Sequence, residues 1–173
     1  CIRDRIYIAP VQFGYLRPIS QQLVRQEMAL IGHQRPVERL SNELRAEFQR
    51  AFRESTSSRY SVVDEPTSNS VTLQLCLLEL NPTCVSGNAA KKAAAFYVGP
   101  AAGLASRWTR GSVAIEGKVK DSPSGVLLFQ FADKEHDKMI LWTLRDFRPY
   151  GHTRMAFREW AQQFEELTRT PDW

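Results

Sequence analysis

Residues 112–133 constrain the fold most, because apolar and polar residues alternate there on both sides of a turn. Before the turn the apolar positions lie two apart. After it Leu127, Phe129 and Phe131 do the same, which is typical of strands with one buried face. Between the two runs, the sequence DSPSG supplies the aspartate, proline and glycine that favour a tight turn. The segment therefore predicts an antiparallel hairpin with one dry face and one partly solvated face.

Three more strands and two clear helices are predicted around this hairpin. The strands are RIYIAPV near the N-terminus, YSVVDE at 60–65 and SVTLQLCLLEL at 70–80. Apolar residues at helical spacing indicate one helix over 36–54 and another near the C-terminus, and a weaker pattern at 19–31 indicates a third. The two strong stripes, which we expect in the core, are Val37, Leu40, Leu44, Phe48, Ala51 and Phe52, and Phe157, Trp160, Ala161, Phe164 and Leu167.

The order of these elements predicts an α+β fold. We expect a two-layer sandwich, in which helices pack on one face of a mainly antiparallel sheet, with an N-terminal strand followed by a helix and with a C-terminal helix. The 173 residues suit a single domain, 1–173, that is large enough to bury a core. The longest apolar window, residues 93–105, is broken by Gly99 and Pro100 and falls short of the ~20 residues of a membrane-spanning helix.

Positive charge is concentrated in the first third of the chain. Residues 1–60 hold ten Arg, no Lys and six acidic residues, whereas residues 61–173 hold thirteen basic and thirteen acidic residues. Such a segment suits either solvated helix faces or a surface that meets anionic lipid, acidic protein or nucleic acid. No nucleic-acid recognition module accompanies the arginines, so we expect no nucleic-acid partner.

The chain has three cysteines, Cys1, Cys76 and Cys84. No CxxC pair occurs and the three histidines are scattered, so we expect no zinc site. One disulfide with a further cysteine and three free thiols both remain open. A first residue that is cysteine rather than methionine indicates either a processed bacterial lipoprotein, lipidated on Cys1, or a truncated chain.

The chemistry-bearing clusters predict no catalytic site, no metal and no cofactor. The densest cluster, ADKEHDK, contains Asp133, Glu135, His136 and Asp137, but a strand would point His136 away from the three carboxylates. The sequence lacks a GxSxG elbow, an SxxK motif and a Walker loop. No nucleophile stands at a recognised spacing from any histidine, so we expect a protein that is not an enzyme.

Residues 83–110 form a long connection rich in alanine and glycine. Connections of this length inside compact domains are uncommon and are often functional. Aromatic and basic residues together are enriched where proteins meet. We therefore predict that this segment is the main partner-binding surface, through Lys91, Lys92, Phe96, Tyr97, Arg107, Trp108 and Arg110.

The predicted hairpin resembles the signature of a family of bacterial lipoproteins, domain of unknown function 3313. The resemblance is carried by an IE element at 115–116, a D-x-x-[ST]-G turn at 121–125, a strand that ends in Asp133, and a C-terminal helix with Trp160 and Ala161. It covers most of the chain and assigns no catalytic residue. It implies export, a lipid on the first mature cysteine, here Cys1, and a position on the periplasmic side of an envelope membrane.

From this resemblance we expect a non-enzymatic accessory or scaffold subunit of the cell envelope, which binds envelope proteins or a second copy of itself. Ile2, where an aspartate would favour the inner membrane, favours the periplasmic face of the outer membrane. The first strand begins within about five residues of Cys1, so the domain would lie against the membrane. The alternatives are an envelope-acting hydrolase and, for the cysteines, a Cys1–Cys84 disulfide with Cys76 buried and free.

Overall fold

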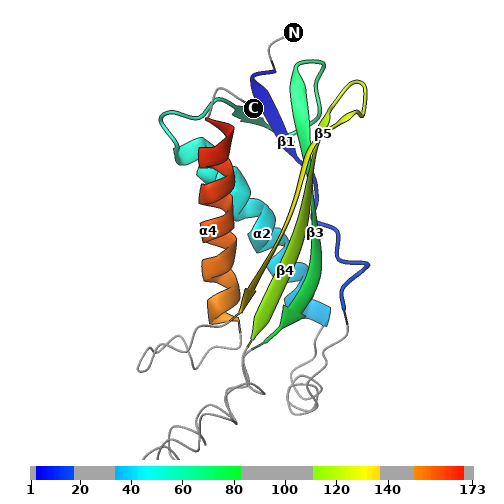
Figure 1. Cartoon of the computed structure of the whole chain (residues 1–173), viewed down its shortest axis with the longest axis vertical. Coiled ribbons are helices and arrows are strands. Elements are labelled where there is room, and N and C mark those ends of the chain that lie inside the picture. The colour runs from blue at the N-terminus through cyan, green and yellow to red at the C-terminus, as the bar shows by residue number, and fades with distance from the viewer. Residues whose placement is uncertain (1–2, 18–33, 83–110, 137–149, 170–173) are drawn as a thin grey trace, which may run out of the picture.

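A five-stranded sheet covered on one face by two helices forms the fold (Figure 1). The structure, a computed structural model, describes residues 3–17, 34–82, 111–136 and 150–169. In chain order the elements are β1 (Arg5–Ile8), α2 (Gln34–Glu54), β2 (Ser61–Val63), β3 (Ser70–Asn81), β4 (Ser112–Asp121), β5 (Leu127–His136) and α4 (Gly151–Thr168). The expected α+β class, with its N-terminal strand then helix and its C-terminal helix, is confirmed. The helix predicted at 19–31 lies outside the described residues.

The sheet is mixed, with the strand order β2-β1-β3-β4-β5. β1 pairs in parallel with β2 on one side and with β3 on the other. Ile6 lies opposite Val62 of β2 and Val71 of β3. The longer pairings, β3 with β4 and β4 with β5, are antiparallel, so the sheet is mostly antiparallel. The parallel pairing of β1 and β2 follows from the chain between them, because a parallel connection needs a crossover and α2 supplies it.

The core lies between the helices and the inner face of the sheet. In α2 the predicted stripe is buried except for Ala51, which is partly buried against the core, and in α4 Phe157, Trp160, Ala161 and Phe164 are buried. The rings of Phe48 and Phe164 join the two helices, with centroids 5.8 Å apart. No helix of the described ranges is long and apolar enough to cross a membrane.

The predicted stripe of α4 is wrong at its last member. Leu167 is 51% exposed, whereas Thr168 is fully buried. Trp160 and Phe164 are both buried and lie four residues apart, so the next inward position at that spacing is 168 and not 167. The Thr168 hydroxyl donates to the Glu165 carbonyl across 2.6 Å, which allows a polar side chain to be buried there.

A bulge alters the predicted hairpin at the start of β5. Leu127 is opposite Lys120 and Phe129 is opposite Val119, so Leu128 is the extra residue. The expectation that Leu127 shares a face with Phe129 and Phe131 is therefore wrong. The face that Leu127 shares is that of Lys120, because side chains of directly paired residues lie on the same side of a sheet.

The sheet has two distinct ends. The start of β1, the start of β3 and the β4–β5 turn lie together, since Arg5 pairs with Ser70 and Val71 pairs with Asp121 (Figure 1, upper end). We call this the turn end. At the other end, which we call the loop end, the last residue of β3 pairs with the first residue of β4, Asn81 with Ser112.

Candidate functional site

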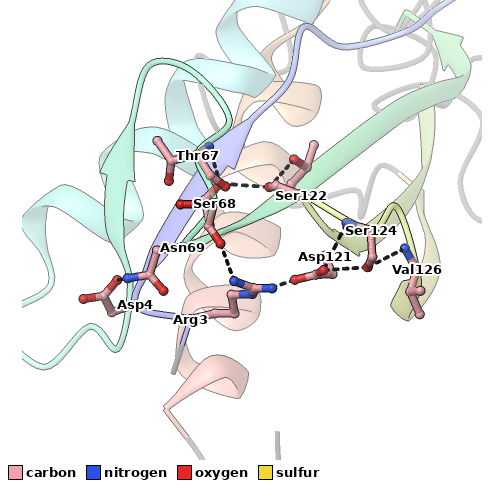
Figure 2. Close-up of polar contacts among 11 residues, drawn as sticks. Arg3, Asp4, Thr67, Ser68, Asn69, Asp121, Ser122, Ser124 and Val126 are labelled. Carbon is pink, nitrogen blue, oxygen red and sulfur yellow. Dashed lines mark hydrogen bonds and ion pairs between the residues drawn. The ribbon is translucent and has the colours of Figure 1, made fainter. Parts of the chain in front are cut away.

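The D-x-x-S-G motif builds the tight turn between β4 and β5 (Figure 2). One Asp121 carboxylate oxygen, Oδ2, accepts hydrogen bonds from the Ser124 hydroxyl at 2.5 Å and the Ser124 backbone amide at 3.2 Å. The Gly125 amide donates to the Asp121 carbonyl at 2.8 Å, and Gly125 adopts a φ of 70°, which favours glycine. Each motif residue therefore has a defined part in the turn.

Arg3 attaches the N-terminal segment to this turn. Its Nε donates to Asp121 Oδ1 at 2.6 Å, and its Nη1 donates to the Ser68 carbonyl in the β2–β3 connection. The Ser124 hydroxyl, followed by Arg3, lowers the pKa of Asp121 below the ordinary value of 3.8 for an aspartate. The carboxylate is therefore ionised at neutral pH and holds three separate segments of chain together.

A second set of polar contacts surrounds the ion pair at the turn end. Ser122 Oγ lies 2.8 Å from Ser70 Oγ and 2.7 Å from Thr72 Oγ1, so the turn is bonded to the start of β3. Asn69 Nδ2 donates to Asp4 Oδ1 at 2.5 Å. Figure 2 shows Asn69 and Asp4 pointing toward one another. The polar groups pair with the protein itself, which is typical of a structural network rather than a ligand site.

The aspartate at the end of the resembling segment, Asp133, also has a protein partner. The Trp160 indole Nε1 donates to Asp133 Oδ2 at 2.6 Å, and the Lys134 amide donates to Oδ1 at 2.7 Å. The motif residue of β5 thus binds the motif residue of α4. Within the described ranges, no group of three potential metal-ligating His, Cys, Asp or Glu side chains occurs, and Asp137 of the cluster considered above lies outside them.

A buried polar cluster at the loop end escaped the sequence analysis. Glu79 is only 8% exposed, and its Oε1 accepts from Ser112 Oγ at 2.5 Å and Asn81 Nδ2 at 3.1 Å. Its Oε2 accepts from Lys134 Nζ at 2.7 Å. A bulge between Leu77 and Glu79 breaks the alternation of β3 and turns the glutamate away from the helices. A glutamate inside the apolar run LLEL was the available signal.

Comparison with models of protein families identifies the family of this chain. The model describes a protein of unknown function, DUF3313, and matches residues 3–164. The chain belongs to the DUF3313 family. The segments that suggested the resemblance, the turn at Asp121, the strand with Asp133 and the helix at Trp160, all lie inside the matched range, although β5 continues past Asp133 to His136.

The DUF3313 chain also has a structural relative. The hypothetical protein CT253 from Chlamydia trachomatis is similar with a TM-score of 0.52 at 11% sequence identity, and the similarity covers 95% of this chain and 98% of that one. At this identity the likeness concerns the fold alone. No curated protein is significantly similar in sequence to the chain.

The residues predicted to bind lipid or partners lie outside the described residues. These are Cys1 for the lipid, and Lys91, Lys92, Phe96, Tyr97, Arg107, Trp108 and Arg110 for partners. The flanks of 83–110 are described, and they meet at the loop end, where Asn81 pairs with Ser112. Cys76 is a free thiol on the outer face of β3, and partial burial, followed by the charge of Glu116, raises its pKa.

Proposed function

We propose that this DUF3313 protein is a non-enzymatic, lipid-anchored scaffold of the bacterial cell envelope. In this proposal Cys1 carries the lipid, the domain sits on the periplasmic face of the outer membrane, and residues 83–110 bind other envelope proteins or a second copy. The protein would then act by holding components together at the membrane.

The main support is how the motif residues use their polar groups. The Asp121 carboxylate accepts from Ser124 and Arg3, and the Asp133 carboxylate accepts from Trp160. A catalytic carboxylate needs a reacting atom within hydrogen-bond reach, whereas these carboxylates contact groups that shape the fold. The carboxylates of the family motif therefore support a structural role rather than a catalytic one.

The positions of the described residues next to the two proposed attachment points add support. Arg3 is bonded to the turn through Asp121. Cys1 is two residues before Arg3, so the chain between them can reach at most about 7 Å. A lipid on Cys1 would hold the turn end close to the bilayer. The flanks of 83–110 meet at the far end of β3, whose twelve residues span about 37 Å. One end would thus serve the membrane and the other the partner.

Intact mass of the protein extracted from its native membrane tests the anchor. We expect the mass of the mature chain plus a diacylglycerol and an acyl chain, and we expect Cys1→Ser to remove both the added mass and the need for detergent. An unmodified Cys1, or release of the protein by salt alone, would contradict the proposal. Crosslinking of the intact protein in membranes, followed by mass spectrometry, would identify the partners.

A hydrolase acting on envelope material is the second candidate, and the cluster at Glu79 favours it. Ser112 Oγ donates to a buried carboxylate, and Lys134 contacts the other oxygen of that carboxylate. Digestion of purified peptidoglycan by the protein and by Ser112→Ala tests this candidate. Products that depend on Ser112 would support the hydrolase, and the absence of products from the wild-type chain would leave the scaffold as the better account.

A further inference from the structure

Four successive apolar residues are exposed where the turn enters β5, and we call them the apolar corner: Val126, Leu127, Leu128 and Phe129. We propose that the apolar corner inserts into the headgroup region of the lipid bilayer beside Cys1. The orientation in this proposal rests on the proposed lipid anchor. The corner would be a second membrane contact that fixes how the domain sits on the surface.

The side chains of the apolar corner are unusually exposed for apolar residues. The four side chains are between 36% and 57% exposed, and they are contiguous in the chain. Contiguous exposed apolar residues mark sites that meet a membrane or another molecule. Val126 is held in place, because its carbonyl accepts from the Asp121 amide at 2.9 Å and its amide donates to Ser124 Oγ at 3.3 Å. The corner is therefore a fixed part of the hairpin.

The geometry of the corner favours lipid over a protein strand. β5 is an edge strand, so its outer edge could pair with another strand, but the bulge at Leu128 interrupts the hydrogen-bonding pattern there. The bulge also places Leu127 on the face of Lys120, while Phe129 lies on the opposite face with Val119. A protein surface would cover one of these faces, whereas a lipid layer surrounds both.

The surroundings of the corner suit the membrane interface. The polar turn next to it has its groups satisfied internally, since Asp121 is paired with Arg3 and bonded to Ser124, which reduces the cost of moving it from water. Lys120, opposite Leu127, forms no ion pair with an acidic residue of the described ranges and is placed to meet an anionic headgroup. The Arg3 contact holds the segment next to Cys1 at this turn, and the two residues from Arg3 to Cys1 reach at most about 7 Å.

Vesicle binding of the full chain carrying Cys1→Ser tests the proposal without any lipid on the protein. Vesicles of phosphatidylethanolamine and phosphatidylglycerol, 3:1, are sedimented with the protein at up to millimolar lipid. We expect measurable binding by the parent chain. We expect Leu127→Ser with Leu128→Ser to lower the partition coefficient by at least about tenfold, because moving even one leucine side chain from water into the bilayer changes partitioning by about that factor. Tyr15→Ser should leave binding unchanged, because Tyr15 is also exposed but its segment is bonded to the second half of β3, through Arg17 to Leu78, away from the turn.

The outcomes separate this proposal from the anchor. Because the tested chain lacks Cys1, its binding does not depend on whether the native protein is lipidated. No vesicle binding, or equal binding by the double-serine variant, would overturn the insertion of the corner. Loss of a concentration-dependent dimer in that variant, without vesicle binding by the parent, would overturn it in favour of a protein interface. Unchanged circular dichroism of the variant establishes that the fold is intact.

Discussion

The indole Nε1 of Trp160 donates a hydrogen bond to Asp133 Oδ2 across 2.6 Å, which ties α4 to the edge strand β5. An edge strand has only one neighbour in its sheet, so contacts from a helix contribute more to its position than they do for a central strand. Phe131 adds to this contact, since its ring centroid lies 5.1 Å from that of Phe164. β5 is thus held by α4 as well as by β4.

Removing the Trp160 side chain should destabilise the domain strongly. Trp160 is 5% exposed, so Trp160→Ala removes a buried ring and the bond to Asp133, and we expect a loss of about 3–5 kcal/mol. Trp160→Phe keeps most of the ring but not the donor and should cost about 1–2 kcal/mol. Urea unfolding monitored by circular dichroism measures both losses.

Asp133→Ala separates the hydrogen bond from the packing. If the bond contributes, Trp160→Phe should cost less in the Asp133→Ala background than in the wild type, and the difference is the coupling free energy. Equal costs in the two backgrounds would mean that the bond contributes nothing. Asp133→Asn keeps an acceptor oxygen and should be milder than Asp133→Ala.

A side chain at Gly117 should disrupt the hairpin. A Cβ at this position would lie 2.2 Å from the Phe131 ring, which covers the glycine from the paired strand. Gly117→Ala must displace the ring from its contact with Phe164, and we expect a cost of about 1–3 kcal/mol and a lower Tm in a thermal melt. Gly14→Ala, where a Cβ would meet nothing within 4 Å, is the control.

Relief of the clash supplies the decisive comparison. Phe131→Leu removes the ring that the new methyl group would meet, so Gly117→Ala should cost much less in the Phe131→Leu background. If Gly117→Ala costs the same in both backgrounds, the ring is not the reason for the glycine, and backbone flexibility would account for the loss.

Much of the fold follows from local patterns in the sequence. The alternation in β3 and β4 identified their inner faces, and the stripe of α2 identified its buried residues, because each of these elements has one face in the core. The turn at Asp121 was evident from its residue types. The family motif then placed Asp133 and Trp160 in the correct elements.

The remaining features depend on tertiary contacts that local patterns do not encode. The bulges at Leu128 and after Leu77 shift the faces of β5 and β3, and a period of two gives no sign of them. The parallel pairing of β1 depends on where α2 returns the chain. The bonds from Arg3 to Asp121 and from Lys134 to Glu79 join residues 118 and 55 positions apart, so neither site could be assembled from sequence spacing.

The ion pair between Arg3 and Asp121 should make the stability of the fold depend on pH in the acid range. The pKa of Asp121 is lowered in the folded state, so its contribution to stability is present above the ordinary value of 3.8 and is lost as the pH falls through the lower folded value. We expect the Tm of Asp121→Asn to lie below that of the wild type at pH 6 and the two to converge in strong acid. Thermal melts from pH 2 to 6 measure this.

Two further variants separate the causes of the lowered pKa. Because the Ser124 hydrogen bond is the largest cause of the lowered pKa of Asp121, Ser124→Ala should reduce the pH dependence of the Tm more than Arg3→Gln does. Parallel curves of Tm against pH for all variants would contradict the assignment.

Replacing residues 82–111 by Asn-Gly should preserve the domain and abolish partner binding. Asn81 and Ser112 are already cross-strand partners, and a two-residue Asn-Gly loop is the connection that antiparallel strands favour. The core residues lie on the inner face of the sheet, so we expect a cooperative thermal transition and the same circular dichroism spectrum. Crosslinked complexes from membranes that express this variant should lack the partners found with the wild type.

The control for this deletion keeps the length of the segment and changes its chemistry. Aromatic and basic residues, rather than the loop itself, are the proposed contacts, so Phe96→Ser, Tyr97→Ser and Trp108→Ser together should lose the partners as fully as the deletion does. Glu79→Gln tests the loop end separately, because it alters the cluster at Ser112 and Lys134 while leaving 83–110 intact. If the complexes survive both the deletion and the triple substitution, residues 83–110 are only a connection between β3 and β4, and the partner must bind elsewhere on the domain.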